Sequence, residues 1–303
     1  MRQIPKDNQM ETKEKNTEFS GKAIYRPKGK AGEYARWAAN LYVGCTNGCT
    51  YCYCRKGVLN HAMGGDQPVL KRCFKDEMHA VWTFNHELLR NKREIIRNGG
   101  IFLSFTTDPC LLTTWKTHFS CVLFALASGV PVTILTKCVG WLEEPYTRYL
   151  WENPQFKERL CVGFTLTGMD DMEPNAASND ERIEAMEMLY SKGIRTFASI
   201  EPVIDITKSV DIITRTRSFC DLYKIGLLTG EKRSYERAEV VNMMADVLYM
   251  SQWILPLKKV YFKDTVLQAA CLTREDLNQF AIEKGYEKTL VGPDYNIFDD
   301  FKK

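Results

Sequence analysis

The chain has 303 residues, of which 45% are hydrophobic, so it is long enough to bury a core of barrel size. Its 41 basic and 38 acidic residues leave a formal net charge of +3, which gives no overall electrostatic reason for binding nucleic acid. The sequence contains no apolar run of about 18 residues, which excludes a membrane-spanning helix, and its eleven cysteines without a signal peptide indicate a reducing cytoplasm rather than a disulfide scaffold.

Short apolar runs alternate with amphipathic stretches along the chain, which is the order of repeated strand and helix units around a parallel sheet. A polar stretch at 1–24 comes first and is expected to be a flexible arm. Strands are then predicted at 40–43, 100–106, 130–135, 160–166, 195–200 and 222–227. Helices are predicted at 75–98, 116–127, 145–152, 180–192 and 234–250.

Six parallel strands with helices outside predict an α/β fold, a partial (β/α)6 barrel at 25–255, followed by a helical appendage at 256–303. In barrels of this kind the reactive groups gather at the C-terminal ends of the strands. We therefore expect the functional residues in the loops that follow the strands.

Three cysteines follow the first predicted strand directly: Cys45, Cys49 and Cys52 in the stretch GCTNGCTYCY. Their C-x3-C-x2-C spacing is typical of a site that holds an iron–sulfur cluster with three thiolates and leaves one iron without a protein ligand. Such an iron can bind a small chelating molecule, whereas a cluster with four thiolates is closed and suited to passing electrons.

A structural zinc site is the alternative, because zinc is also bound by thiolates. It usually needs four nitrogen or sulfur ligands in two spaced pairs, and no second C-x2-C or H-x3-5-H pair occurs downstream. Cys54 could supply a fourth thiolate, although only one residue separates it from Cys52. The spacing favours the iron–sulfur cluster, and the role of Cys54 stays open.

The cysteine loop and its surroundings resemble the radical S-adenosylmethionine (SAM) superfamily, and within it the spore photoproduct lyase-like branch. The likeness covers about residues 25–205, and the motifs that carry it are YRPKGKAGEYA at 25–35, SFTTDP at 104–109, ILTK at 134–137, FTLT at 164–167 and EPNAAS at 173–178. The resemblance implies a barrel of the radical SAM type, a [4Fe–4S] cluster and SAM on its open iron. It also implies an electron donor such as flavodoxin or ferredoxin.

Carried over by position, the resemblance implies SAM contacts from Thr107, Asp108, Lys137 and Thr165. It also implies that Tyr51 and Tyr53 match a hydrogen-relay pair near SAM, and Arg182 is a further candidate for SAM binding. A carboxylate or hydroxyl can orient an ammonium and ribose hydroxyls, and a cationic Lys137 or Arg182 can pair with a carboxylate. Each residue also has a structural alternative. Asp108 can turn the chain, Lys137 can be solvated, Arg182 can cap its own helix, and Tyr51 can shield the cluster from solvent.

Three further residues are candidates for catalysis: Tyr53, Cys110 and Glu201. The lyases that repair the thymine dimer carry a hydrogen-donating cysteine at the position of Phe105, and a phenyl ring cannot donate that hydrogen. Cys110 or Tyr53 would have to replace it, although Cys110 also fits a small buried hydrophobic residue. Glu201 ends the fifth predicted strand, where a carboxylate can contact substrate or SAM, or can simply be an exposed turn residue.

The leading hypothesis is an enzyme that cleaves SAM and abstracts hydrogen from a substrate at the mouth of the barrel. One alternative is a DNA lesion lyase or nucleotide-modifying enzyme, with nucleic acid as its partner. Another is an iron–sulfur or zinc binding module without turnover. The sequence does not identify the substrate.

Overall fold

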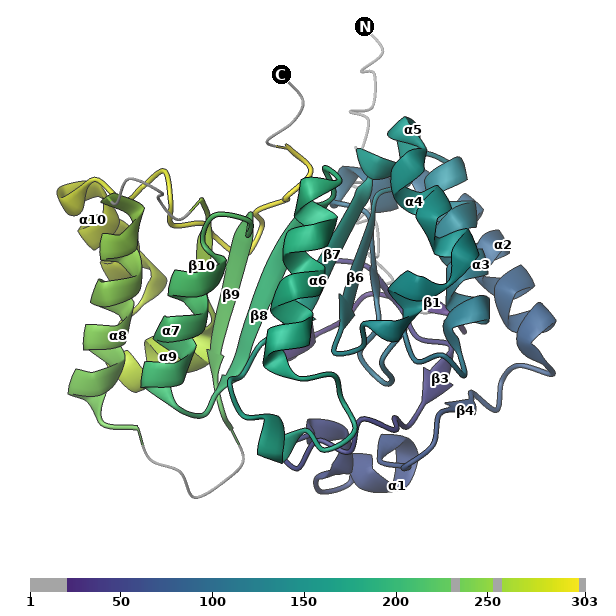
Figure 1. Ribbon diagram of the computed structural model, residues 1–303, viewed down its shortest axis with the longest axis horizontal. Coiled ribbons are helices and arrows are strands. Elements are labelled where there is room, and N and C mark those ends of the chain that lie inside the picture. The colour runs from purple at the N-terminus through teal and green to yellow at the C-terminus, as the bar shows by residue number, and fades with distance from the viewer. Residues whose placement is uncertain (1–20, 230–234, 253–257, 300–303) are drawn as a thin grey trace, which may run out of the picture.

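The computed structural model describes residues 21–229, 235–252 and 258–299, and its central feature is an eight-stranded sheet (Figure 1). The strands lie in the order β1-β2-β5-β6-β7-β8-β9-β10, and every neighbouring pair is parallel except β1 with β2. The strands are β1 (Ile24–Tyr25), β2 (Ala38–Ala39), β5 (Ile101–Leu103), β6 (Val132–Thr136), β7 (Leu160–Thr165), β8 (Arg195–Val203), β9 (Leu222–Leu227) and β10 (Val260–Phe262). The fold is therefore α/β with a mostly parallel sheet.

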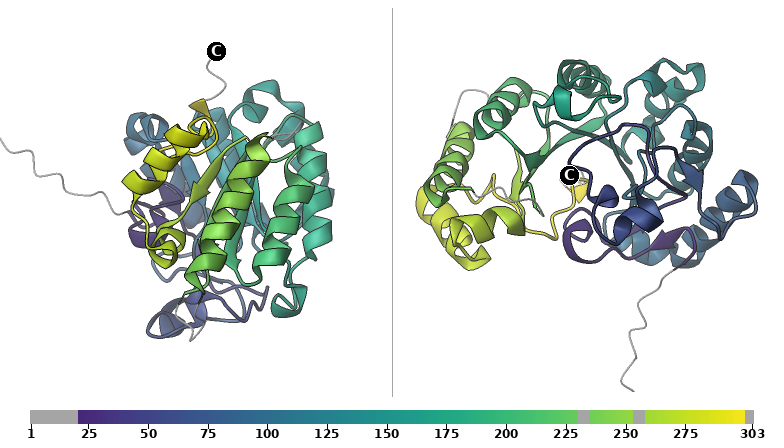
Figure 2. Two further views of the ribbon diagram at one scale, coloured as in Figure 1. Left: turned by 90° about the vertical axis from the view of Figure 1, so that its left-hand side faces the viewer. Right: turned by 90° about the horizontal axis from the view of Figure 1, so that it is seen from below.

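Helices follow the strands and cover the outer face of the sheet, as the two further views in Figure 2 show. The α-helices are α1 (Leu59–Met63), α2 (Glu77–Arg97), α3 (Trp115–Ala127), α4 (Tyr149–Glu152), α5 (Pro154–Lys157), α6 (Asn179–Ser191), α7 (Ile206–Thr216), α8 (Arg237–Tyr249), α9 (Asp264–Ala270) and α10 (Arg274–Lys284). Short 3-10 helices lie at Gly29–Ala31, Tyr53–Arg55, Gly140–Glu143, Pro145–Arg148, Asp170–Met172 and Met250–Gln252. No helix in the described ranges is both long and apolar enough to cross a membrane.

The central strands are buried on both faces, as parallel strands between two layers must be. In β7 all six residues are buried, and Val162 joins the main core between the sheet and the helices. Its neighbour Cys161 points the other way, into a smaller apolar cluster on the inner face. Ile297 and Phe298, near the end of the described chain, belong to this inner cluster.

The first predicted strand is misplaced. The strand that joins the main sheet is β2, whereas Tyr42–Val43 forms β3 and pairs with β4 (Val69–Leu70) in a separate two-stranded sheet. Asn40 explains the break, because its side-chain oxygen accepts a hydrogen bond from the backbone of Phe105 at 2.9 Å and its side-chain nitrogen donates to Tyr25. The chain therefore leaves the main sheet after Ala39.

Apart from the short elements β1, α1, β4 and α5, one helix and one strand were not predicted. Helix α7 follows β8 and begins at Asp205, whose side chain caps it by accepting from the backbone of Lys208 at 3.0 Å. The expected helical appendage contains α9 and α10, but it also adds β10 to the sheet beside β9. Val260, Tyr261 and Phe262 are β-branched or aromatic, which favours a strand.

Three of the predictions concern residues outside the ranges that the structure describes. This holds for residues 1–20 of the expected arm, for the start of the predicted helix at 234 and for the predicted boundary at 255/256. Residues 21–24 of the expected arm are part of the fold, because Glu87 of α2 accepts hydrogen bonds from the backbone of Lys22, Ala23 and Ile24 at 2.8 to 3.0 Å.

Candidate functional site

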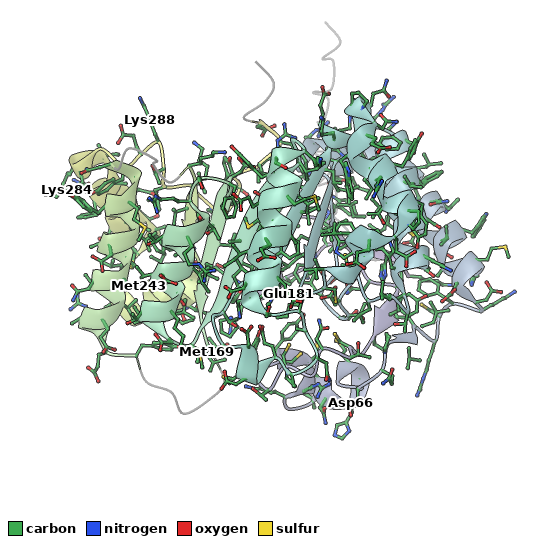
Figure 3. All side chains as sticks on the ribbon, viewed as in Figure 1. Asp66, Met169, Glu181, Met243, Lys284 and Lys288 are labelled. Carbon is green, nitrogen blue, oxygen red and sulfur yellow. The ribbon has the colours of Figure 1, made fainter. Side chains whose placement is uncertain are left out.

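A cavity of about 480 Å³ lies at the C-terminal ends of the parallel strands, beside the cysteine loop. Of the residues predicted for the site, it is lined by Cys45, Cys49, Tyr51, Cys52, Tyr53, Thr107, Asp108, Lys137, Thr165 and Glu201. Cys110 and Arg182 are fully buried and do not line it. In Figure 3 this end of the molecule is the lower one, where Met169 is labelled; Met169 packs against the apolar group around Cys49 and Tyr51.

Two glycines allow the cysteine loop to approach its neighbours closely. Gly44 has a φ of +84°, and a Cβ there would lie 2.3 Å from the carbonyl oxygen of Gln67. Gly48 has a φ of +70°, and a Cβ there would lie 3.0 Å from the side-chain nitrogen of Asn175. A larger residue at either position would force the backbone to move.

The three thiols of the loop have different acidities. Burial, and after it the charge of Asp108, raises the pKa of Cys45 to about 11, and burial also raises the pKa of Cys49. The neighbouring Cys54 thiol lowers the pKa of Cys52.

The cysteine loop fits an iron–sulfur cluster by the chemistry and placement of its donors. No three histidine, cysteine, aspartate or glutamate side chains of the described residues converge as ligands of one metal ion do. In an iron–sulfur cluster each cysteine binds a different iron, so the thiolates need not converge on one point. Cys45, Cys49 and Cys52 lie on one loop and line the same cavity, so their three thiolates would be the groups that hold a cluster.

Asp108 connects the cysteine loop to the sheet. It accepts hydrogen bonds from the Asn47 side chain at 3.0 Å, the Thr136 hydroxyl at 2.6 Å and the backbone nitrogens of Cys110 and Lys137 at 3.0 and 2.7 Å. A carboxylate has about four hydrogen-bond acceptor sites, so these four donors use nearly all those of Asp108. Asp108 therefore positions the loop through Asn47, a role that its sequence motif did not indicate.

Glu173 is a buried acid at the centre of a charged group that the sequence analysis did not name as a site residue. It accepts hydrogen bonds from the Tyr51 hydroxyl and from the Arg182 guanidinium, and it lies 4.0 Å from the Lys137 ammonium. Arg182 also donates to the carbonyl oxygen of Thr165 at 2.5 Å. Arg182 therefore holds Glu173 and the end of β7, and it is not among the residues that line the cavity.

Lys137 carries the positive charge of the cavity wall near the cysteines. Burial alone would lower the pKa of Lys137, but Cys49 and Glu173 outweigh burial and raise it. The ammonium nitrogen lies 5.5 Å from the centre of the Tyr51 ring. Lys137 is therefore charged at neutral pH and available to an anionic group in the cavity.

Thr107 lines the cavity and carries a buried hydroxyl without a protein partner in the described residues. Its side-chain oxygen is buried and makes no hydrogen bond within the described part of the chain. A buried polar atom without a partner costs free energy, so such an atom at a cavity wall favours a polar ligand there. Thr165 lines the same wall from the end of β7.

The opposite end of the cavity carries a second set of polar residues, Tyr34, Ser199, Glu201 and Lys263, here called the Glu201 end. Lys263 is 1% exposed, and its ammonium donates to both carboxylate oxygens of Glu201 at 2.8 Å. The Tyr34 hydroxyl bonds Glu201 and lies 2.6 Å from the Ser199 hydroxyl. Burial, and after it the charge of Glu201, raises the pKa of Tyr34, so the phenol stays protonated.

Lys224 lies beside the Glu201 end and gives a pH-dependent prediction. Burial, and after it repulsion from Lys263, lowers the pKa of Lys224 from 10.5 to about 7. Between these two values the unfolded chain binds one more proton than the folded chain, so the free energy of unfolding rises with pH. We expect the wild-type protein to gain stability relative to Lys224→Met between pH 7 and about pH 9 in urea denaturation. A constant difference between the two proteins over that range would contradict the prediction.

The two hydrogen-donor candidates lie in different surroundings. Tyr53 is 53% exposed, and its hydroxyl donates to the backbone oxygen of Phe105 at the cavity wall. Cys110 is completely buried in the main core, where burial raises its pKa. Tyr53 can therefore reach a molecule in the cavity, whereas Cys110 cannot do so in this structure.

Comparison with known proteins gives one sequence relative. The chain is 27% identical over 261 residues to the uncharacterized protein MJ0683 of Methanocaldococcus jannaschii, covering 78% of this chain and 91% of that protein. No family model matches the chain.

Solved structures share the fold. SuiB of Streptococcus suis bound to S-adenosylmethionine has a TM-score of 0.52 at 11% identity, covering 75% of this chain and 47% of SuiB. SuiB bound to its precursor peptide SuiA has a TM-score of 0.55 at 12% identity, covering 80% of this chain and 53% of SuiB. Spore photoproduct lyase complexed with dinucleoside spore photoproduct has a TM-score of 0.53 at 14% identity, covering 76% of this chain and 77% of the lyase. The chain thus has the fold of these radical SAM enzymes, and it spans about half the length of SuiB.

Proposed function

We propose that this protein is a radical SAM enzyme. Cys45, Cys49 and Cys52 would hold a [4Fe–4S] cluster, and the adjoining cavity would hold SAM with its substrate beyond it. The observation that carries the proposal is that three free thiols, the unpartnered Thr107 hydroxyl and the Lys137 ammonium line one end of a single cavity. The fold shared with SAM-bound SuiB supports it.

When bound, the reduced cluster supplies the electron that splits SAM into methionine and a 5′-deoxyadenosyl radical able to abstract hydrogen. The chain's own residues would bind SAM and orient it. Lys137 pairs with the carboxylate of SAM, and Thr107 exchanges a hydrogen bond with one of its polar groups. Glu173, held by Arg182, accepts a hydrogen bond from Tyr51 of the cysteine loop, and its charge helps to keep Lys137 protonated. A flavodoxin or ferredoxin is the proposed class of electron donor.

The Glu201 end would contact the substrate. It lies in the same cavity as the cysteines but on strand β8, on the segment before β2 and directly after β10. Substrates labelled with deuterium at the reacting carbon would pass the label to 5′-deoxyadenosine, which mass spectrometry detects. A set of nucleosides, oligonucleotides and peptides tested in this way distinguishes a nucleotide-modifying enzyme from the other substrate classes.

The Lys137→Ala variant is expected to keep its iron but to bind SAM at least about tenfold more weakly. The reason is that a hydrogen bond to a charged group contributes roughly 1.5–3 kcal/mol, and Lys137 is not an iron ligand. Anaerobic calorimetry measures the affinity, with Lys116→Ala as the control because Lys116 is exposed on α3. Equal SAM affinities in both variants would remove Lys137 from the binding site.

DNA lesion repair is the second candidate function, favoured by the fold shared with spore photoproduct lyase. We expect the protein to leave the spore-type thymine dimer unrepaired, because Phe105 occupies the position of the hydrogen-donating cysteine. Chromatography of the dinucleoside photoproduct after incubation with SAM and reductant checks this. Clean recovery of two thymidines would contradict the expectation, and loss of that activity in Tyr53→Phe would then identify Tyr53 as the donor.

A further inference from the structure

Helix α2 carries a row of side chains along its outer surface, in which four apolar residues are exposed and two polar residues, Asn85 and Lys92, are half-buried. The row consists of Met78, Trp82, Asn85, Leu89, Lys92 and Ile96, hereafter the α2 seam. Its four apolar members are 80%, 63%, 54% and 39% exposed in chain order. The positions are spaced alternately by four and three residues, which is the spacing of a coiled-coil seam that a second helix covers.

The α2 seam is accessible in the described part of the molecule. The opposite side of α2 packs into the main core through Ala80, Phe84, Leu88 and Ile95. In Figure 1 the helix lies at the right-hand end of the molecule, on the outer side of the sheet. Apolar side chains gathered on one face in this way indicate an interaction surface more than singly scattered ones do.

We propose that the α2 seam is the interface of a homodimer in which two α2 helices pack antiparallel across a two-fold axis near Glu87. The seam is symmetric about this residue, because Met78 and Ile96 are each nine residues from Glu87. Trp82 and Lys92 are each five residues from it. An antiparallel second copy therefore brings Ile96 against Met78 and Lys92 against Trp82 at both ends of the interface, as a self-complementary two-fold contact requires.

The Trp82 ring is well placed for this contact. It stacks on His86 with ring centres 5.5 Å apart and an angle of 13° between the planes. His79 stacks on the same ring, with ring centres 6.4 Å apart and an angle of 20° between the planes. A ring fixed in this way loses little freedom on binding.

The charges at the two ends of α2 favour the antiparallel direction. Asp76 and Glu77 lie at its start, and the exposed Arg93 and Arg97 lie in its last turns. No acidic side chain of the described residues forms an ion pair with either arginine. An antiparallel copy places the acidic start beside the basic end, whereas a parallel copy would place the arginines of both copies together.

The association state of the full-length protein in sedimentation equilibrium tests the proposal. The wild type is expected to be a dimer that dissociates on dilution, because dimerisation depends on protein concentration. Leu89→Asp is expected to be monomeric at every concentration, since it places a charge at the centre of the seam. Circular dichroism should show an unchanged fold, because Leu89 is 54% exposed.

Two controls make the test specific. Ile282→Asp changes an apolar residue of α10 that is 70% exposed, and it should leave the dimer intact. Arg97→Glu should weaken the dimer, and Glu77→Arg combined with Arg97→Glu should restore it. A monomeric wild type, or a Leu89→Asp protein that stays dimeric, would overturn the proposal, as would a dimer that Ile282→Asp disrupts equally.

Discussion

The Cys49→Ala variant is expected to hold no iron–sulfur cluster and to form no 5′-deoxyadenosine. Cys49 is the most buried of the three predicted ligands, 7% exposed, and lies in the apolar group with Tyr51 and Ile204. With only three thiolates available, removing one leaves a cluster without sufficient anchorage. Iron and acid-labile sulfide content after anaerobic reconstitution, together with visible absorption, measures the loss. Cys45→Ala and Cys52→Ala should behave in the same way.

Cys54→Ala is the matched control, because Cys54 is also buried, at 6% exposure, and lies on the same stretch of chain. Its thiol donates a hydrogen bond to the backbone oxygen of Phe105 at 3.6 Å, so it has a partner of its own apart from a cluster. We expect this variant to keep its cluster. If Cys54→Ala lost iron as completely as Cys49→Ala, the assignment of a site with three cysteines would fail.

The Arg182→Met variant is expected to lose about 3–5 kcal/mol of unfolding free energy, because removing one partner of a buried ion pair leaves the other charge unpaired. Both side chains of the Arg182 and Glu173 pair are 0% exposed. Arg182 also holds the carbonyl oxygen of Thr165, so the variant loses a second buried contact. Urea denaturation of the wild type and the variant measures the difference.

The double variant Glu173→Gln with Arg182→Met removes the buried negative charge as well and should recover part of that loss. Arg215→Met is the surface control, since Arg215 pairs with Asp180 at 2.6 Å but the two side chains are 45% and 72% exposed. An exposed pair contributes at most about 1 kcal/mol. If Arg182→Met cost no more than Arg215→Met, Arg182 would not be the group that holds Glu173.

The cysteine loop and most strand ends could be predicted because their signals are local. Cys45, Cys49 and Cys52 are close in sequence, so their spacing can be recognised without knowing the fold. The apolar runs that became β6, β7 and β9 lie within a residue or two of their predicted positions. In a parallel sheet consecutive strand ends share one edge, so Thr107, Lys137 and Thr165 were expected together and do line one cavity.

The pairing of charged residues could not be predicted, because it joins parts of the chain that are distant in sequence. Tyr34 and Lys263 reach Glu201 from segments that lie before β2 and after β10. Arg182 looked like a SAM ligand by position, yet the fold turns it toward Glu173. A sequence motif identifies such residues but does not determine which atoms they contact.

Two of the errors in secondary structure have local causes. The apolar run before the cysteines was read as one strand, but Asn40 interrupts it by bonding outside the sheet. Helix α7 was overlooked although Asp205 is a good N-cap and Ile206, Val210 and Ile213 have helical spacing.

Formation of 5′-deoxyadenosine from SAM tests the central claim most directly. The wild-type protein, reconstituted with iron and sulfide and reduced without oxygen, should release 5′-deoxyadenosine and methionine, while Cys49→Ala treated in the same way should release neither. A wild-type protein that holds a reducible [4Fe–4S] cluster and returns SAM intact would contradict the account.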